Sequence, residues 1–266
     1  MRAPIGALRS LSKLTVGAPG DQASRRRVVL IHGAAHGAWC WEILTPKLIA
    51  HGFEVDSFDL PGLGDDRTPP QEVTFQSYVH AIRRVVEAKP GPVVMLGHSL
   101  GGWPMSAAAE ALPHRVDHLV YLASFVPRDG EKIRDLSEAV AQFDGPSAFA
   151  ALRPSAIKGA HEFAVELAVD TFYNLCAPGV ADSAVRRLRP QADAPLVPAI
   201  RVSPGRFGAI AKTYVVCSKD RALPPAAQHW QCERHPDMRK FVLEADHSPF
   251  FSAPDALAAL VAETLA

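Results

Sequence analysis

Short apolar runs alternate along the chain with stretches in which apolar residues recur at every third or fourth position. The runs are too short for helices and rich in β-branched residues, so they predict buried strands at 28–31, 53–60, 92–96, 118–123, 213–217 and 240–243. The amphipathic stretches predict helices at 39–51, 75–88, 107–112, 224–232 and 254–265. This order is typical of an α/β protein with a mostly parallel, doubly wound sheet and helices on both faces.

The alternation stops between about residues 127 and 211. That segment is rich in proline and predicts only helical pieces, at 132–143, 161–176 and 181–188. We therefore expect one core, formed by residues 27–127 and 212–266, with residues 128–211 inserted as a helical cap over the carboxyl ends of the strands, where such sheets bind ligands.

Residues 1–26 differ from the rest of the chain. They are basic, with Asp21 as their first acidic residue, and lack the continuous apolar stretch of a secretory signal. We expect an N-terminal extension, in which 11–16 is a candidate edge strand.

Charge and composition argue against several classes of partner. Lys and Arg total 28, as do Asp and Glu, so the formal net charge is zero, which disfavours nucleic acid or an anionic membrane surface as the main partner. No apolar run approaches the ~20 residues that span a bilayer. The cysteines have no C-x-x-C spacing, so we expect reduced thiols and a cytoplasmic protein. The oligomeric state stays open, a homodimer included.

The clearest chemical signal is the stretch Gly97-His98-Ser99-Leu100-Gly101, between a predicted strand and a predicted helix. A serine at the tip of a sharp strand–turn–helix is the nucleophile elbow, G-x-S-x-G. The glycines let neighbouring segments approach closely, and the turn exposes the serine hydroxyl. We expect the His98 side chain to point away from Ser99 and to pack.

A serine nucleophile needs a base and a third group that orients the base. Asp220 and His247 each follow a predicted strand, as Ser99 does, and the chain order Ser99, Asp220, His247 is that of an α/β-hydrolase. The three are predicted to be the catalytic residues. Asp246 competes with Asp220 for the role of orienting carboxylate, but a residue next in sequence usually cannot reach its neighbour's ring in the required geometry.

A tetrahedral oxyanion needs two preorganised donors. The Leu100 N–H lies at a helix N-terminus, free to bind an anion. The second donor is expected from the loop after the first core strand, and we assign it to the Ala34 N–H. His32 is expected to brace this loop.

Together these motifs resemble those of the plant methylesterase and hydroxynitrile lyase group of α/β-hydrolases, which includes the salicylic acid-binding esterases. The resemblance runs from about residue 28 to the C-terminus. It rests on the segments 32–41, 97–102, 173–176, 188–190, 218–220, 228–230 and 245–247.

The resemblance implies an α/β-hydrolase fold and hydrolysis of small carboxylic esters without a metal or cofactor. It also implies that the cap and the residue after Ser124 line the acyl pocket, which makes Phe125 and Tyr173 candidate substrate-binding residues.

Two departures bear on the choice within the group. Its hydroxynitrile lyases carry a threonine where this chain has Gly33, and a lysine where it has Ser248. Ser248 cannot supply the charge with which that lysine stabilises cyanide. The esterase branch is therefore favoured. A lyase with the same three residues, and a small-molecule receptor on the same fold, remain as alternatives.

The expected cap is rich in aromatic residues, which suggests the shape of the substrate. An aromatic cover over Ser99 favours a compact apolar group, because each buried CH₂ is worth about 0.8 kcal/mol while an unpaired buried charge costs several. The sequence places no arginine or lysine beside Ser99, so we expect a small neutral ester. The aromatic residues concerned are Phe143, Phe149, Phe163, Phe172 and Tyr173.

Overall fold

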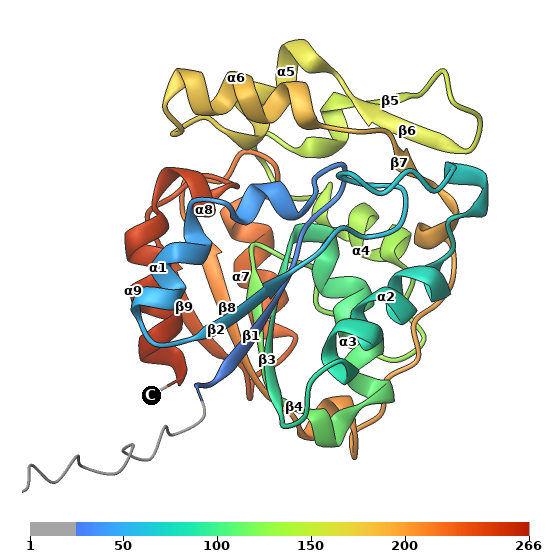
Figure 1. Ribbon diagram of the computed structural model, residues 1–266. Helices are drawn as coiled ribbons and strands as arrows, with labels where there is room; N and C mark the ends of the chain where they lie inside the picture. Colours follow the sequence, from blue (N-terminus) through green and yellow to red (C-terminus); the bar gives the residue numbers. More distant parts are fainter. Residues whose placement is uncertain (1–24, 266) are drawn as a thin grey trace, which may run out of the picture.

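The computed structural model describes residues 25–265, so the candidate edge strand at 11–16 lies outside the described residues. Its centre is a six-stranded sheet, in which every neighbouring pair of strands is parallel (Figure 1). In spatial order the strands are β2 (Glu54–Ser57), β1 (Arg27–Ile31), β3 (Val93–His98), β4 (Val116–Leu122), β8 (Ala211–Cys217) and β9 (Arg239–Leu243). The predicted parallel α/β sheet is confirmed.

Helices cover both faces of the sheet and bury alternate residues of its strands. Along β1, Val29 and Ile31 pack into one hydrophobic cluster, while Val28 and Leu30 pack into another on the opposite face. All four side chains are buried, which explains why β1 is apolar at successive positions. The core helices are α1 (Leu44–Ala50), α2 (Phe75–Glu87), α3 (Gly102–Ala111), α7 (Pro225–Glu233), α8 (Pro249–Ser252) and α9 (Pro254–Leu265).

The predicted helix at 39–51 is two separate pieces. A 3₁₀ turn occupies Ala38–Trp41, and α1 begins only at Leu44. The reason is Pro46, which lacks a backbone N–H and whose ring would clash with the carbonyl of residue 42 in a continuous helix. Proline is tolerated in the first turn, so α1 begins just before it.

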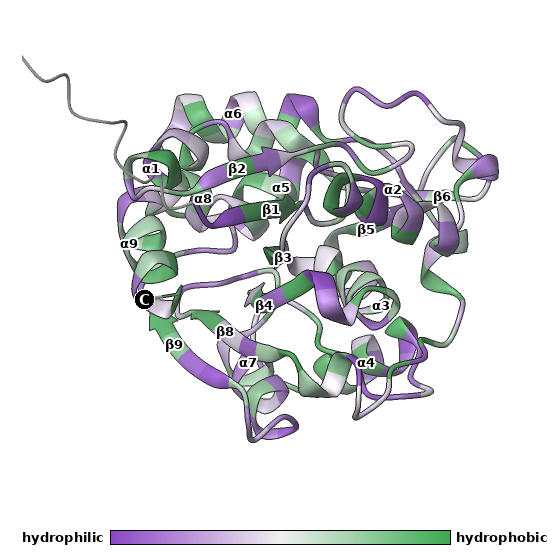
Figure 2. Cartoon of the chain, turned by 60° about the horizontal axis from the view of Figure 1, so that its bottom comes forward, coloured by the Kyte–Doolittle hydropathy of each residue, from purple (hydrophilic) through white to green (hydrophobic). Residues whose placement is uncertain are grey.

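The strand β2 lies at the edge of the sheet and is mostly polar, as its colouring in Figure 2 shows. Lys89 donates hydrogen bonds to Glu54 at 2.5 Å and to Asp56 at 2.9 Å along this edge. Charged side chains on an edge strand oppose pairing with another chain. Within residues 25–265, no helix is long and apolar enough to cross a membrane.

The middle of the inserted segment, from about residue 147 to residue 192, lies above the carboxyl ends of the strands, while its last residues run down beside the core (Figure 1). The helices of the segment are α4 (Ile133–Val140), α5 (Val165–Phe172) and α6 (Pro178–Arg187). It also holds a three-stranded antiparallel sheet, formed by β5 (Leu152–Pro154), β6 (Ala160–Phe163) and β7 (Gln191–Ala192). The cap is therefore mixed and not purely helical.

The predicted helix at 161–176 is wrong over its first residues. Gly159 has a φ of +79°, a left-handed conformation that glycine adopts readily and that turns the chain back on itself. Residues 160–163 consequently pair with β5 and β7 as a strand, and α5 occupies only Val165–Phe172. Pairing with distant strands has overridden the helical periodicity.

Candidate active site

Ser99 lies at the end of β3, in a sharp turn with a φ of +50°. That left-handed conformation is strained for a residue with a side chain and is frequent at functional sites. The glycines on either side explain how the turn is accommodated. A Cβ on Gly97 would lie 2.9 Å from the Cα of Gly102, and one on Gly101 would lie 2.5 Å from the carbonyl oxygen of His32. The turn and α3 therefore lie directly against the neighbouring strands.

Asp220 and His247 meet beside this turn, as predicted. The His247 Nδ1–H donates to Asp220 Oδ2 at 2.7 Å, and both side chains are buried. Ser99 and His247 line the same cavity. The Ser99 hydroxyl has no hydrogen-bond partner within residues 25–265; bonds between nucleophile and base are often long until substrate binds.

The Asp220 carboxylate is fixed on both oxygens. Its Oδ1 accepts the backbone N–H groups of Ala222 at 2.7 Å and Leu223 at 2.8 Å. Its Oδ2 accepts from His247 and, at 2.8 Å, from Gln228 Nε2. The Gln228 carbonyl in turn accepts the Cys217 N–H at 2.9 Å, which ties this side chain to the end of β8. Gln228 is fully buried and holds the carboxylate in the orientation that His247 requires.

Sequence reasoning gave Gln228 no role, because a glutamine on a helix carries no chemical signal of its own. We expect Gln228→Leu to lower kcat for p-nitrophenyl acetate by about 10-fold to 100-fold with little change in KM, since displacing a reacting group by about 1 Å can cost 10²-fold. Gln231→Leu is the matched control: Gln231 is equally buried on α7 but contacts Val126 and Arg234 and not Asp220. An equal loss of kcat in both variants would show a general packing effect.

Asp246 does not orient His247. Its Oδ1 accepts from the Ser248 N–H at 3.0 Å and from the Ser252 hydroxyl at 2.6 Å. Its Oδ2 accepts the Leu175 N–H at 2.9 Å. The carboxylate therefore links the cap to the loop that carries His247. Asp220, and not Asp246, contacts the His247 ring, and its catalytic role stays a prediction.

His98 packs directly on His247, with 4.6 Å between the ring centroids. Its Nε2–H donates to the backbone carbonyl of His247 at 2.8 Å. Burial lowers the pKa of His98 well below its usual value, so the ring is neutral, as a donor–acceptor imidazole. The expectation of a packing role is confirmed, with the addition that His98 holds the His247 backbone in place.

His32 braces the loop after β1, as predicted. Its Nδ1–H donates to the carbonyl of Gly33 at 2.9 Å, and its Nε2 accepts the Leu60 N–H at 3.0 Å. This bracing places Ala34 at the cavity wall, where Leu100 also lies. The assignment of the Ala34 and Leu100 N–H groups to an oxyanion hole stays a prediction.

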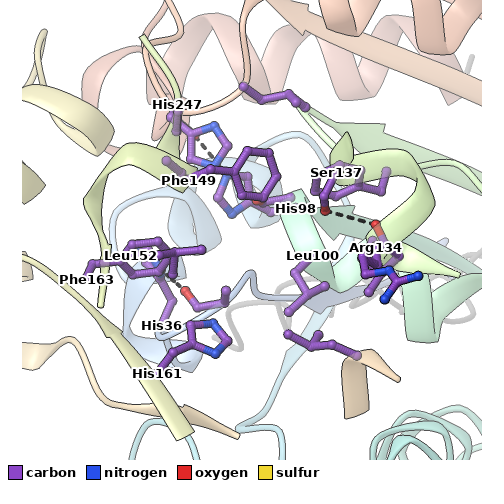
Figure 3. A pocket seen from close by; sticks show the side chains of 18 of the residues that line it. His36, His98, Leu100, Arg134, Ser137, Phe149, Leu152, His161, Phe163 and His247 are labelled. Carbon is purple, nitrogen blue, oxygen red and sulfur yellow. Dashed lines mark hydrogen bonds between the residues drawn. The ribbon is translucent and has the colours of Figure 1, made fainter. Parts of the chain in front are cut away.

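A cavity of about 490 Å³ lies between Ser99 and the cap (Figure 3). Most of its wall is apolar, and Phe125 is part of it. From the predicted aromatic cover, Phe149, Phe163 and Phe172 line the cavity. Phe143 instead packs against Trp230, with 5.9 Å between the ring centroids.

The prediction that Tyr173 lines the cavity is wrong. Tyr173 is almost fully buried behind the wall, and its hydroxyl donates to His36 Nε2 at 2.8 Å. His36 takes the place at the wall, and its Nδ1–H donates to the carbonyl of Ala34 at 2.7 Å. Because the Ala34 carbonyl only accepts, Nδ1 carries the proton and Nε2 accepts from the tyrosine. Burial lowers the pKa of His36 to about 3, so this ring is neutral.

Polar residues of the cap also line the cavity, and sequence reasoning missed them. Lys132 and Arg134, at the start of α4, are exposed, and Arg134 pairs with Glu138 at 3.3 Å. His161 belongs to β6 of the small cap sheet, and Asp193 directly follows β7. The sequence gave no indication of them, because their approach to the cavity depends on how the cap folds back over the strands.

The fold is that of an α/β hydrolase. Residues 28–260 match the alpha/beta hydrolase family, and the chain belongs to that family. Methylesterase 7 from Arabidopsis thaliana is 29% identical over 91% of this chain and 97% of its own length. Salicylic acid-binding protein 2 from Nicotiana tabacum is 28% identical over 90% and 96%. Among solved structures, the pyrethroid hydrolase PytH with BIF is 25% identical, with a TM-score of 0.79, over 91% of this chain and 98% of that one.

Proposed function

We propose that this chain is a serine carboxylesterase that works through an acyl-enzyme on Ser99, His247 and Asp220. The observation that carries the proposal is the His247–Asp220 hydrogen bond of 2.7 Å beside a strained serine, at the wall of a largely apolar cavity. Relatives named methylesterase and methyl jasmonate esterase support the same reaction.

The chemistry follows from the roles of the three side chains. Nε2 of His247 takes the Ser99 proton as the hydroxyl attacks the ester carbonyl, and Asp220 stabilises the imidazolium that forms. The tetrahedral oxyanion accepts hydrogen bonds from the N–H groups of Ala34 and Leu100. His247 then protonates the departing alcohol, and a water molecule activated by the same ring releases the acid.

The geometry gives no support to a cyanohydrin lyase. A Cβ on Gly33 would lie 3.0 Å from both the Ser99 Cβ and the His98 Nδ1, which leaves little room for a threonine. Ser248 is fully buried, and its hydroxyl has no hydrogen-bond partner within the described residues. No positive charge is available at that position to stabilise a cyanide leaving group.

The substrate group next to Ser99 is small, apolar and uncharged in this proposal. Phe125, Phe172 and Leu223 line the cavity together with Ser99, while the charged residues Lys132 and Arg134 come from the exposed start of α4. A cavity of about 490 Å³ lies within the range of roughly 300–1,000 Å³ found for small-molecule sites.

Among p-nitrophenyl esters from C2 to C12, we expect kcat/KM to be highest for acyl chains well below C10, because a cavity of about 490 Å³ holds a compact acyl group and not a long lipid chain. Initial rates at matched concentrations give the profile. A maximum at C10 or longer would contradict the enclosed pocket. No hydrolysis of any member, together with no labelling of Ser99 by a fluorophosphonate, would favour a receptor over an enzyme.

A cytoplasmic location is part of the proposal and is supported by the cysteines. All four, Cys40, Cys176, Cys217 and Cys232, are free thiols in the structure. Burial raises the pKa of Cys40 and Cys217 well above the usual value, so these thiols are protonated and unreactive, as structural thiols are in a reducing compartment. A homodimer stays a prediction of the sequence.

A further inference from the structure

Most polar side chains at the cavity wall are already engaged by the protein. His36 uses both ring nitrogens, on Ala34 and Tyr173. The Nε2–H of His98 is used on the His247 carbonyl, and the Ser137 hydroxyl donates to the Ile133 carbonyl at 2.9 Å. His98 Nδ1 has no partner among the described residues, but the His98 side chain is fully buried. Apart from the proposed base His247, His161 is the histidine of the wall that differs: one of its nitrogens has no partner within the described part of the chain, and its side chain is partly exposed.

The other nitrogen of His161 is firmly held. Its Nδ1–H donates to Asp193 Oδ1 at 2.7 Å. The cap sheet fixes this pair: His161 lies opposite Gln191 where β6 and β7 pair, and the Asp193 N–H donates to the Gly159 carbonyl at 2.9 Å. The His161 side chain is only 20% exposed.

The cavity therefore contains two histidines that are each oriented by an aspartate. The His161–Asp193 and His247–Asp220 hydrogen bonds are both 2.7 Å long, and both histidines line the cavity. Since a carboxylate only accepts, the proton of the neutral His161 ring lies on Nδ1. Its Nε2 is then a hydrogen-bond acceptor with a defined orientation.

His161 and His247 line different parts of the cavity wall. In Figure 3, His247 is near the top of the view and His161 near the bottom. Apolar side chains, including Phe149, Leu152 and Phe163, line the wall as well. Ser99 and His161 line the same cavity, so a substrate whose ester lies at Ser99 contacts His161 when its length spans the space between them.

We propose that His161 Nε2 accepts a hydrogen bond from a hydroxyl group that the substrate carries away from its ester. The substrate class is then an uncharged, largely apolar ester with an alcoholic or phenolic hydroxyl at the far end. This inference rests on the proposed esterase function. A carboxylate is a poorer match than a hydroxyl, because Nε2 presents a lone pair and the negatively charged Asp193 lies directly behind the ring.

Paired methyl esters test the proposal. They are the esters of 4-hydroxybenzoate, 4-hydroxyphenylacetate and 3-(4-hydroxyphenyl)propanoate, each compared with the same ester lacking the hydroxyl. For the pair whose length matches the space between Ser99 and His161, we expect kcat/KM to be about threefold to tenfold higher with the hydroxyl, mainly through a lower KM. A ratio of this size corresponds to the net contribution of one hydrogen bond. In His161→Leu this ratio falls to about one.

Two further variants show whether the effect belongs to the His161–Asp193 pair. Asp193→Ala leaves His161 in place but frees its ring, so the hydroxyl preference also falls. His51→Leu removes an exposed histidine that does not line the cavity, and the preference stays at the wild-type value. Thermal melting and fluorophosphonate labelling of Ser99 show whether each variant is folded.

The outcomes are distinguishable. A wild-type ratio of one for all three pairs, or a ratio that survives in His161→Leu, overturns the role of His161 while leaving the esterase intact. If the wild type hydrolyses none of the six esters and p-nitrophenyl acetate also fails, the proposed function falls and this inference falls with it. If p-nitrophenyl acetate is hydrolysed but none of the six is, only the substrate class is wrong.

Discussion

Replacing Ser99 with alanine is expected to lower kcat for p-nitrophenyl acetate by about 10⁴-fold to 10⁶-fold, as is typical for a triad nucleophile. Without the hydroxyl, no acyl-enzyme forms, and the His247–Asp220 pair has no nucleophile to activate. The fold should be unaffected, because the Ser99 hydroxyl makes no hydrogen bond within residues 25–265. Loss of the oxygen also removes none of the apolar packing around the turn.

The measurement combines steady-state kinetics, fluorophosphonate labelling and thermal melting. The variant should lose both turnover and labelling while it melts at the temperature of the wild type. Ser183→Ala is the matched control, because Ser183 is an exposed serine on α6, outside the cavity wall. Turnover by Ser99→Ala within tenfold of the wild type would disprove the assignment of the nucleophile.

Gly101→Ala is expected to lower the free energy of unfolding by about 3 kcal/mol, a typical cost of overpacking at a site that cannot give way. Gly101 has a φ of −58°, so alanine suits the backbone conformation. The cost arises from space alone. The added Cβ would lie 2.5 Å from the His32 carbonyl oxygen and 2.8 Å from that of Ile31, and both are backbone atoms at the end of β1.

The effect is measured by urea or thermal unfolding, where about 3 kcal/mol corresponds to a fall in Tm of roughly 6–12 °C for a chain of this size. Gly179→Ala is the control, because Gly179 lies within α6 and a Cβ there would meet no atom within 4 Å. That substitution should leave stability unchanged or raise it by up to about 1 kcal/mol. Equal Tm values for Gly101→Ala and the wild type would show that β1 or the turn shifts freely.

The sequence by itself determined the sheet and the placement of the three proposed catalytic residues. Strands buried on both faces are apolar at every position, so runs such as 28–31 are visible without a structure. Ser99 and Asp220 follow strands of this kind, while His247 follows the edge strand β9, which is only partly buried. Because the strands are parallel, their carboxyl ends lie at the same edge of the sheet. The position of each residue after a strand was therefore enough to predict that the three lie close together.

The orientation of the side chains in the proposed catalytic site depends on contacts between segments that are far apart in the sequence. Gln228 supports Asp220 only because α7 packs beside the end of β8, and no local pattern marks one buried glutamine over another. The sequence could separate Asp220 from Asp246 as the partner of the His247 ring because that choice rested on local geometry. Adjacent residues in a loop have limited reach, and that limit holds in any fold.

Only the tertiary structure decided the cap. Its strands are two to four residues long, and such short pieces are stable only when paired, so periodicity alone gave a helix where β6 forms. The pairing of β6 places His161 at the cavity, whereas Tyr173, just after α5, turns behind the wall to reach His36. In irregular segments, side-chain direction is set by packing partners far away in the chain, which a repeating pattern of apolar residues does not encode.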